Sequence, residues 1–320
     1  MEDWRDADPG LVQTLYARER ERWRRDLWWE TEASWAIVEE GRTLGHVPGW
    51  ILRDSDGTVL GWTFYVMHER ELQIGGLTAD RAVDLRQLLD RVLDSPEASL
   101  ATSMSGFIFP AVPSLVSALG RRRFAVRQSL YLSKPLPAAE PTGAAVQTAF
   151  RLRPFADRDM LGAVRLLAAA YDGEPGAQCF APRGRLEEWV RYVRQLIETP
   201  ACGTFQRSAS LVAEDPATLR LAGLVLCTQL SAETAHVAQL VVGQHARRQR
   251  LGEALLMRAS AESSLTGAIR LTLMVDEGNA RARALYARHQ FTQVSAFAFG
   301  RRRVQVRHGA PLGVPHRIAV

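Results

Sequence analysis

Cysteine is scarce in this 320-residue chain, and long apolar runs are missing. Cys179, Cys202 and Cys227 are far apart and odd in number, so they fit neither a disulfide framework nor a zinc pattern. No apolar run reaches the ~18 residues that a membrane span needs. The start of the chain, MEDWRDADPG, is too acidic and polar for a secretory signal. These absences predict reduced cysteines, no metal, no membrane and a cytoplasmic location.

The positive charge of the chain comes almost entirely from arginine. The net charge is +5, and the arginines occur in short clusters. Anionic cofactors, acidic surfaces and nucleic acid all suit such a surface. The stretch RWRRDLWWETEASW mixes aromatic and basic residues, a pattern that can stack on nucleic-acid bases. Its acidic residues favour packing instead, so we do not expect a nucleic-acid partner, although a nucleic-acid-associated basic module stays an alternative.

A segment rich in proline, alanine and glycine, residues 136–147, has no periodicity and is predicted to be a linker. It separates residues 1–135 from residues 148–320. After their first helices, both halves repeat one order: two strands around a turn, a strand, a helix, a strand, a helix and an ending strand pair. This order predicts a tandem duplication of an α+β domain, each copy a mixed, mostly antiparallel central sheet flanked by helices.

The stretch VVGQHARRQRLGEALL, residues 241–256, predicts a strand, a loop and a helix. The first turn of a helix has four backbone N–H groups without partners, and the helix dipole favours an anion there. Gly252 allows close approach of a pyrophosphate to the backbone. Arg247, Arg248 and Arg250 can add charge-assisted hydrogen bonds. A solvated loop is the alternative interpretation.

Two motifs together resemble the GCN5-related N-acetyltransferase (GNAT) superfamily. The family's cofactor motif is a strand ending in Val, followed by Arg/Gln-x-x-Gly-x-Gly/Ala at the start of a helix. Val242 and Gly252 match it, and Arg250 occupies the place of the first glycine. A second motif is matched within NARARALYARHQF, by Asn279, Ala282, Leu285, Tyr286 and Phe291, with Gln290 in place of a glycine. The resemblance covers residues 148–306, and the layout of the chain is similar to that of tandem, mycothiol-synthase-like members.

The resemblance implies acetyl-CoA as co-substrate. The residues predicted to bind it are Leu240, Val241, Val242, Arg247, Arg248, Gln249, Arg250, Leu251, Gly252, Glu253, Asn279 and Ala282. The strand backbone is expected to bind the pantetheine amides as an added strand would. The N–H of Val241 or Val242 would polarise the acetyl carbonyl. Asn279 is expected to contact the pantetheine arm, although it also suits a helix N-cap.

The resemblance also suggests catalytic residues. Tyr286 is expected to protonate the leaving thiolate; a tyrosine packed in the core is the alternative. Some family members place a base Glu six residues before the strand-final valine, and here that position is His236. Its ordinary pKa of ~6.5 suits a general base, but a buried strand histidine is an equal alternative. Glu233, expected on the same strand, is the second candidate, and water is the third.

The segment AYDGEPGAQCFAPRG, residues 170–184, is expected to shape the acceptor site. Tyr171, Asp172 and Glu174 would bind a cationic amine there, or they are ordinary polar loop residues. The N-terminal half lacks both motifs and is predicted to be a degenerate, non-catalytic copy.

The sequence thus predicts an N-acetyltransferase that transfers acetyl from acetyl-CoA to a primary amine of a small molecule or protein. Attack would be direct, in a ternary complex, and the chain would be a monomer or homodimer. A non-catalytic protein that binds or senses acyl-CoA is the alternative, because Arg250 replaces a glycine.

Overall fold

The computed structural model describes residues 1–137 and 147–304. The described elements of the N-terminal half are β1 (Glu2–Asp3), α1 (Pro9–Leu27), α2 (Glu32–Thr43), β2 (Gly49–Arg53), β3 (Val59–His68), β4 (Glu71–Ala79), α3 (Ala82–Leu93), α4 (Pro96–Leu100), β5 (Ser103–Ile108), α5 (Pro113–Arg121) and β6 (Ala125–Pro135). Most of the predicted linker, residues 138–146, lies outside the described residues.

The C-terminal half follows the same order. Its described elements are β7 (Arg151–Pro154), η1 (Asp157–Asp159), α6 (Met160–Ala170), η2 (Pro175–Cys179), α7 (Leu186–Glu198), β8 (Thr204–Phe205), β9 (Leu211–Glu214), β10 (Leu221–Ser231), β11 (Thr234–Val242), η3 (Gln244–Ala246), α8 (Leu251–Leu265), β12 (Arg270–Asp276), α9 (Ala280–Arg288) and β13 (Thr292–Arg303). None of the helices in residues 1–137 and 147–304 is long and apolar enough to cross a bilayer.

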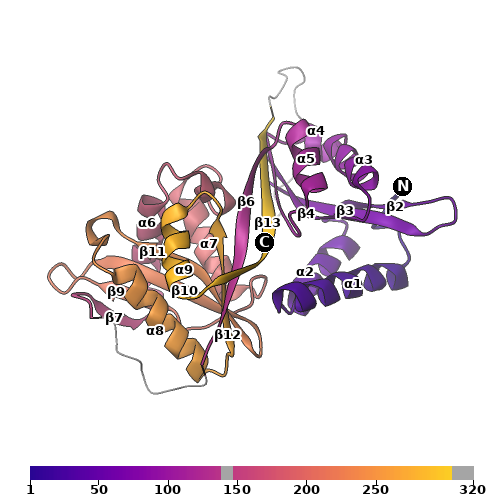
Figure 1. Ribbon diagram of the computed structural model, residues 1–320. Helices are drawn as coiled ribbons and strands as arrows, with labels where there is room; N and C mark the ends of the chain where they lie inside the picture. Colours follow the sequence, from indigo (N-terminus) through magenta and orange to yellow (C-terminus); the bar gives the residue numbers. More distant parts are fainter. Residues whose placement is uncertain (138–146, 305–320) are drawn as a thin grey trace.

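One mixed sheet runs through both halves (Figure 1). Its strand order is β1-β2-β3-β4-β5-β13-β6-β12-β11-β10-β9-β7, with β8 paired to β10. The pairs β4–β5 and β11–β12 are parallel, and the other pairs among the described strands are antiparallel. A mostly antiparallel sheet flanked by helices confirms the predicted fold class.

Each half contains one parallel pair of described strands, and the two pairs have the same length and position in their halves. In the N-terminal half, four residue pairs join β4 to β5, from Glu71↔Ser103 to Ile74↔Gly106. In the C-terminal half, four residue pairs join β11 to β12, from Thr234↔Arg270 to Val237↔Leu273. In both copies the first strand of the pair continues beyond the last pairing, so the two strands diverge at equivalent positions.

The two halves exchange their last strands. The sequence predicted an ending strand pair in each half, and this prediction was wrong, because each segment forms one long strand, β6 or β13. β6 pairs with β12 over Arg270–Asp276 and with β13 on its other side. β13 in turn pairs with β5. The domain boundaries predicted at residues 136–147 divide the chain in sequence, but each half supplies a strand that continues the sheet of the other.

Helices cover both faces of the sheet. On β13, Ala298 packs in the core under α3 and α5, and Ala296 packs against the core under α8. Phe297 points to the opposite face, where it packs with Leu27 and Trp29 from the end of α1. That second face also carries α6 and α7 over β10 and β11. It is the face on which the candidate site opens.

We predict that residues 147–320 do not fold stably alone. Without β6, strands β12 and β13 lose the partner between them, and Leu130 and Leu132 leave the core under α8. Co-expression of residues 1–137 and 147–320 as two chains should give a soluble complex that co-purifies. The single C-terminal chain should be aggregated or unfolded by circular dichroism. A monomeric, cooperatively unfolding C-terminal fragment would show that β6 is dispensable.

Candidate active site

The site is built where β11 and β12 diverge. β11 continues to Val242 and β12 to Asp276, but their pairing ends at Val237 and Leu273. A β-bulge accompanies the divergence, since Val237 pairs with Cys227 on β10 and Gln239 with the adjacent Leu226, which leaves Ala238 unpaired. From Ala238 to Val242 one edge of β11 therefore has no strand beside it.

The direction of the peptide groups on this edge follows from one hydrogen bond. The N–H of Gly243 donates to the carbonyl of Ala222 on β10 at 2.8 Å. Because N–H groups alternate in direction along a strand, the N–H of Val241 also faces β10, while those of Leu240 and Val242 face the open edge. Of the two valines expected to polarise an acetyl carbonyl, Val242 has the suitable direction and Val241 does not.

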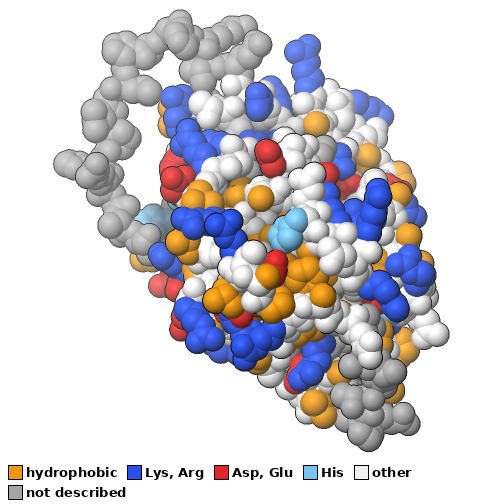
Figure 2. Space-filling view, turned by 90° about the vertical axis from the view of Figure 1, so that its left-hand side faces the viewer, with side chains coloured by type: hydrophobic (Ala, Val, Ile, Leu, Met, Phe, Trp, Pro, Cys, Tyr) orange, Lys and Arg blue, Asp and Glu red, His pale blue; other side chains and the backbone are white. Residues whose placement is uncertain are grey.

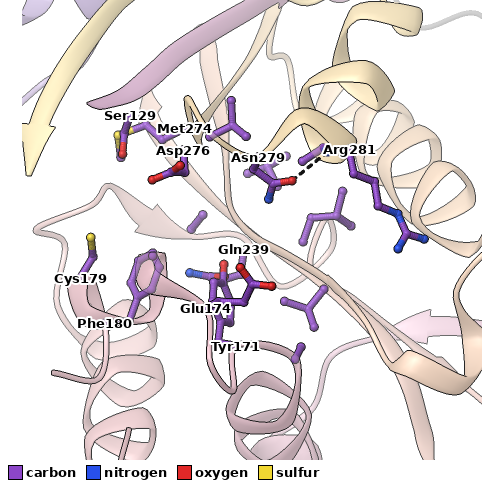
Figure 3. A pocket seen from close by; sticks show the side chains of 18 of the residues that line it. Ser129, Tyr171, Glu174, Cys179, Phe180, Gln239, Met274, Asp276, Asn279 and Arg281 are labelled. Carbon is purple, nitrogen blue, oxygen red and sulfur yellow. Dashed lines mark hydrogen bonds between the residues drawn. The ribbon is translucent and has the colours of Figure 1, made fainter. Parts of the chain in front are cut away.

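A cavity of about 1240 Å³ occupies this opening (Figure 3). Its walls come from β11, the start of α8, α9, the loop between α6 and α7, and strands β4, β5 and β6 of the N-terminal half. The volume exceeds the ~300–1,000 Å³ of typical small-molecule pockets.

The loop before α8 has an unusual backbone. Arg248 and Arg250 have φ values of 65° and 55°, in the left-handed region that glycine adopts most easily. The side chain of Arg250 is 68% exposed and forms an ion pair with Glu253, with Nε 2.8 Å from Oε2. The ion pair holds Arg250 alongside the first turn of α8, at the rim of the cavity. No side chain caps that turn, so its N–H groups stay open.

Gly252 lies in that first turn and lines the cavity. A Cβ added there would lie 3.4 Å from Cγ2 of Val242 and 3.8 Å from Cδ2 of Leu285, which are ordinary contacts. Packing within the chain therefore does not require a glycine. What its missing side chain provides is free space beside the open N–H groups.

Arginine side chains surround this end of the cavity. Arg247, Arg248, Arg281 and Arg288 line it and are exposed. None of the four forms an ion pair with a carboxylate of residues 1–137 or 147–304. Figure 2 shows that the face on the left of Figure 1 carries more basic than acidic side chains. The surroundings of the open helix end therefore favour an anion.

Tyr286, on α9, also lines the cavity. Its ring packs edge-on against Phe291 at a centroid distance of 5.6 Å. Burial raises the pKa of its phenol well above the usual value. The hydroxyl therefore keeps its proton at neutral pH and is a weaker acid than an exposed tyrosine, so its contribution to an anion beside it begins as a hydrogen bond.

Asn279 caps the start of α9. Its Oδ1 accepts a hydrogen bond from the N–H of Ala282 at 3.0 Å, as Figure 3 shows. The amide nitrogen makes no hydrogen bond to the described residues, and the side chain lines the cavity. The N-cap and a contact with a ligand are thus compatible roles for this residue.

Comparison with known proteins identifies the domain. Residues 165–291 match the model of the acetyltransferase (GNAT) family. This part of the chain is a GNAT domain. Members of this family carry out acyl-CoA-dependent acetyl transfer and generally use acetyl-CoA. No curated protein matches the chain significantly.

Several solved structures share the fold. A GCN5-related N-acetyltransferase from Sphaerobacter thermophilus is 16% identical, with a TM-score of 0.57 and 87% of each chain covered. A tandem GNAT protein from the clavulanic acid biosynthesis pathway is 17% identical, with a TM-score of 0.55 over 80% of this chain and 82% of that one. A GCN5-related glucosamine N-acetyltransferase region of a fungal GH3 β-N-acetylglucosaminidase is 11% identical, with a TM-score of 0.56 over 89% of this chain and 36% of that one.

His236 of the GNAT domain does not fit the expected role of general base. It is 1% exposed, between the rings of Trp29 and Tyr131. Its Nδ1 lies 2.9 Å from Oγ1 of Thr272, whose hydroxyl donates to the carbonyl of Ala235. Nδ1 must then carry the ring proton, and Nε2 has a lone pair. Burial lowers the pKa of His236 to about 3, so it is a weak base and stays neutral at physiological pH.

His236 lines the cavity, but three of the predicted residues lie away from it. Glu233 is not on β11 but in the turn before it, at the opposite end from Val242, where it is 61% exposed and pairs with Arg270. This position excludes it as a base. Asp172 is exposed and does not line the cavity, and the side chain of Gln249 bonds back to the carbonyl of His245.

The other predicted residues line the cavity, with partners that the sequence did not indicate. Glu174 lies at the loop between α6 and α7, and the hydroxyl of Tyr171 donates to Oε1 of Gln239 at 3.0 Å. Gln239 in turn donates to the hydroxyl of Tyr192 at 2.8 Å. Ala238, at the bulge, also lines the cavity. The motif that the sequence matches begins at Val242, so it does not include Gln239.

Metal chemistry has no evident site in the described structure. Within residues 1–137 and 147–304, no three His, Cys, Asp or Glu side chains are grouped so that they could hold a metal ion. The three cysteines are free thiols.

We predict that His236 makes stability depend on pH. Its folded-state pKa, about 3, is below the ~6.5 of an unfolded chain. Between these values the unfolded state binds more protons, so stability falls as the pH falls from 6.5 towards 3, by ~2 kcal/mol between pH 7 and pH 5. Denaturant titrations at both pH values should show this loss in the wild type and in the exposed-site control His46→Gln, but not in His236→Gln. Equal pH dependence in all three proteins would contradict the prediction.

Proposed function

We propose that this protein is an acetyl-CoA-dependent N-acetyltransferase that acts on a primary amine in a ternary complex. The observation that carries the proposal is the open edge of β11 beside an open start of α8, in one cavity of the GNAT domain. The alternative of a protein that only senses acyl-CoA depended on Arg250 blocking the site. Arg250 lines the cavity, but it is held by Glu253 and does not cap the N–H groups of the first turn of α8, so it gives that alternative no support.

The chain's own groups suit each part of acetyl-CoA. The N–H groups of Leu251, Gly252 and Glu253 would hold the pyrophosphate at the positive end of α8. Arg247 and Arg248 would contact the phosphates from the rim. The peptide groups of Leu240 and Val242 would pair with the pantetheine amides as an added strand does. Asn279 would donate its free amide N–H to the same arm.

The proposed reaction forms a bond from the amine nitrogen to the acetyl carbon and breaks the bond from that carbon to sulfur. Val242 would donate its N–H to the carbonyl oxygen as negative charge develops on it. Tyr286 would donate its proton to the departing sulfur. Since His236 is a weak base and Glu233 is distant, the amine would arrive uncharged or lose its first proton to water. The proton that the nitrogen then loses on forming the amide would return through water to the phenolate of Tyr286.

Gly252 provides a test of cofactor binding. Gly252→Asp should abolish acetyl-CoA binding, because it places a negative charge where the pyrophosphate would lie. Gly252→Ala is the matched control: its methyl group meets only ordinary contacts, so the fold should be intact and binding reduced far less. Isothermal titration with acetyl-CoA gives both affinities. Unchanged affinity in a folded Gly252→Asp protein would show that the phosphates of acetyl-CoA do not bind at the start of α8.

Tyr286 provides a test of the chemistry. Tyr286→Phe should lower kcat by ~10²–10⁴-fold, the usual size of general acid catalysis, with little change in the KM for acetyl-CoA. The ring is kept, so packing against Phe291 should persist. CoA-thiol release with the best acceptor of an amine panel measures the effect. Tyr65→Phe, in the N-terminal half, controls for loss of a hydroxyl as such. Full turnover by Tyr286→Phe would contradict the role of Tyr286 as the acid and would indicate that water protonates the sulfur.

A further inference from the structure

The cavity extends beyond the cofactor opening, across the middle of the joined sheet. Asp276 of β12, Arg127 and Ser129 of β6, Phe299 of β13 and Phe107 of β5 all line it. Three of these five residues belong to the N-terminal half. None of them lies in either GNAT motif.

Strand register places these side chains on one surface. Phe299 is paired with Arg127 on one side and with Phe107 on the other. Ser129 is paired with Asp276. Directly paired residues project from the same face of a sheet, and so do residues two apart in one strand. The five side chains therefore form a continuous floor, which begins beside the opening at Asp276 and ends at Phe107.

A roof faces this floor. Cys179 and Phe180, from the loop between α6 and α7, lie across the cavity from Ser129 and Asp276 (Figure 3). Burial raises the pKa of the Cys179 thiol to about 12, so it is a neutral, weakly polar group. Phe180 packs at 4.8 Å from the ring of Tyr192. The roof is thus mainly apolar and aromatic.

The N-terminal half also holds this roof in place. Arg183 forms an ion pair with Glu69, in the turn between β3 and β4, at 2.9 Å. Arg191 of α7 lies 2.5 Å from the neighbouring His68. From the floor, Nη1 of Arg301 donates to the carbonyl of Pro182 at 2.6 Å. These contacts fix the height of the compartment.

Polarity changes along the floor. Near the opening are the carboxylates of Asp276 and Glu174, and Arg127 forms a two-point ion pair with Asp276 at 2.6 and 2.7 Å. Farther away are the rings of Phe299 and Phe107. Adjacent strands are ~4.8 Å apart, so β13 lies roughly 10 Å from β12. A charged end near the acetyl group thus gives way to an aromatic stretch, with the uncharged side chains of Ser105 and Gln73 beyond it.

We propose that the two halves together form the acceptor compartment and that its substrate is an arylalkylamine. The amine would lie at Asp276 and Glu174, beside the opening, and the aromatic ring would lie between Phe180 and the floor at Phe299 and Phe107. The separation favours a ring several bonds from the nitrogen. This inference rests on the proposed acetyl transfer. A polyamine is not favoured, because the cavity lining contributed by β4, β5 and β13 contains no carboxylate for a second ammonium group.

A panel of primary amines tests the compartment in the full-length protein. Rates of CoA-thiol release with acetyl-CoA are compared for benzylamine, 2-phenylethylamine, 4-phenylbutylamine, n-hexylamine, spermidine and a lysine-containing peptide. We expect 4-phenylbutylamine to exceed benzylamine and n-hexylamine in kcat/KM by at least tenfold. Higher kcat/KM for spermidine or the peptide would overturn the inference.

Two variants assign the preference to the N-terminal half. Phe107→Leu should raise the KM for 4-phenylbutylamine about tenfold and leave kcat and the KM for acetyl-CoA within twofold. Phe124→Leu is the matched control, a buried phenylalanine of the same half that does not line the cavity. Thermal unfolding and acetyl-CoA titration of each variant come first. Failure to bind acetyl-CoA in the wild type would contradict the proposed function itself, whereas tight binding with no response of amine KM to Phe107→Leu would contradict only the compartment.

Discussion

The hydrogen bonding of β6 between β12 and β13 is the interaction on which the rest of the structure depends. It joins the sheets of the two halves into one, and it sets the register of the cavity residues on β12 and β13 relative to those on β6. It also brings Arg127 of one half against Asp276 of the other. A shift of one residue in this register would turn Arg127 and Ser129 to the opposite face and remove both from the cavity. The continuity of the floor across the two halves therefore depends on this one strand.

In the N-terminal half, β4 and β5 diverge as β11 and β12 do, but side chains fill the space between them. β4 has a bulge at Gly75, the position equivalent to Ala238, and diverges from β5 as β11 does from β12. A Cβ at Gly75 would lie only 2.2 Å from the ring of Phe64, which covers the bulge. α3 then begins at Ala82, three residues after β4 ends at Ala79, with no room for a phosphate-binding loop. This half contributes strands to the lining of the cavity and an ion pair to the loop between α6 and α7.

The features of the structure that could be predicted from the sequence are those that depend on a few neighbouring residues. The strand, loop and helix around Gly252 and the N-cap at Asn279 follow from spacing and capping preferences over a few residues, as does the order of elements in each half. The exchange of β6 and β13 could not be predicted from the sequence, because alternating apolar and polar residues predict a strand but do not show which other strand it pairs with. His236 shows the same limit: its position in a strand suggested a base, but its pKa is set by Trp29 and Tyr131, which are distant in sequence. Arg127 and Phe107 entered the site only through pairing between the halves.

The strand exchange also has a consequence during synthesis on the ribosome. β5 ends at Ile108, and its neighbour in the sheet, β13, starts at Thr292, about 180 residues later. At ~5–20 residues per second, ~10–40 s separate the emergence of the two strands. Throughout that interval the nascent N-terminal half has an unpaired strand edge with Phe107 beside it, the kind of edge that attracts other chains. Among the described strands, β13 is translated last, and it is the strand that covers this edge of β5, so the edge stays open to association until residues 292–303 have been synthesised.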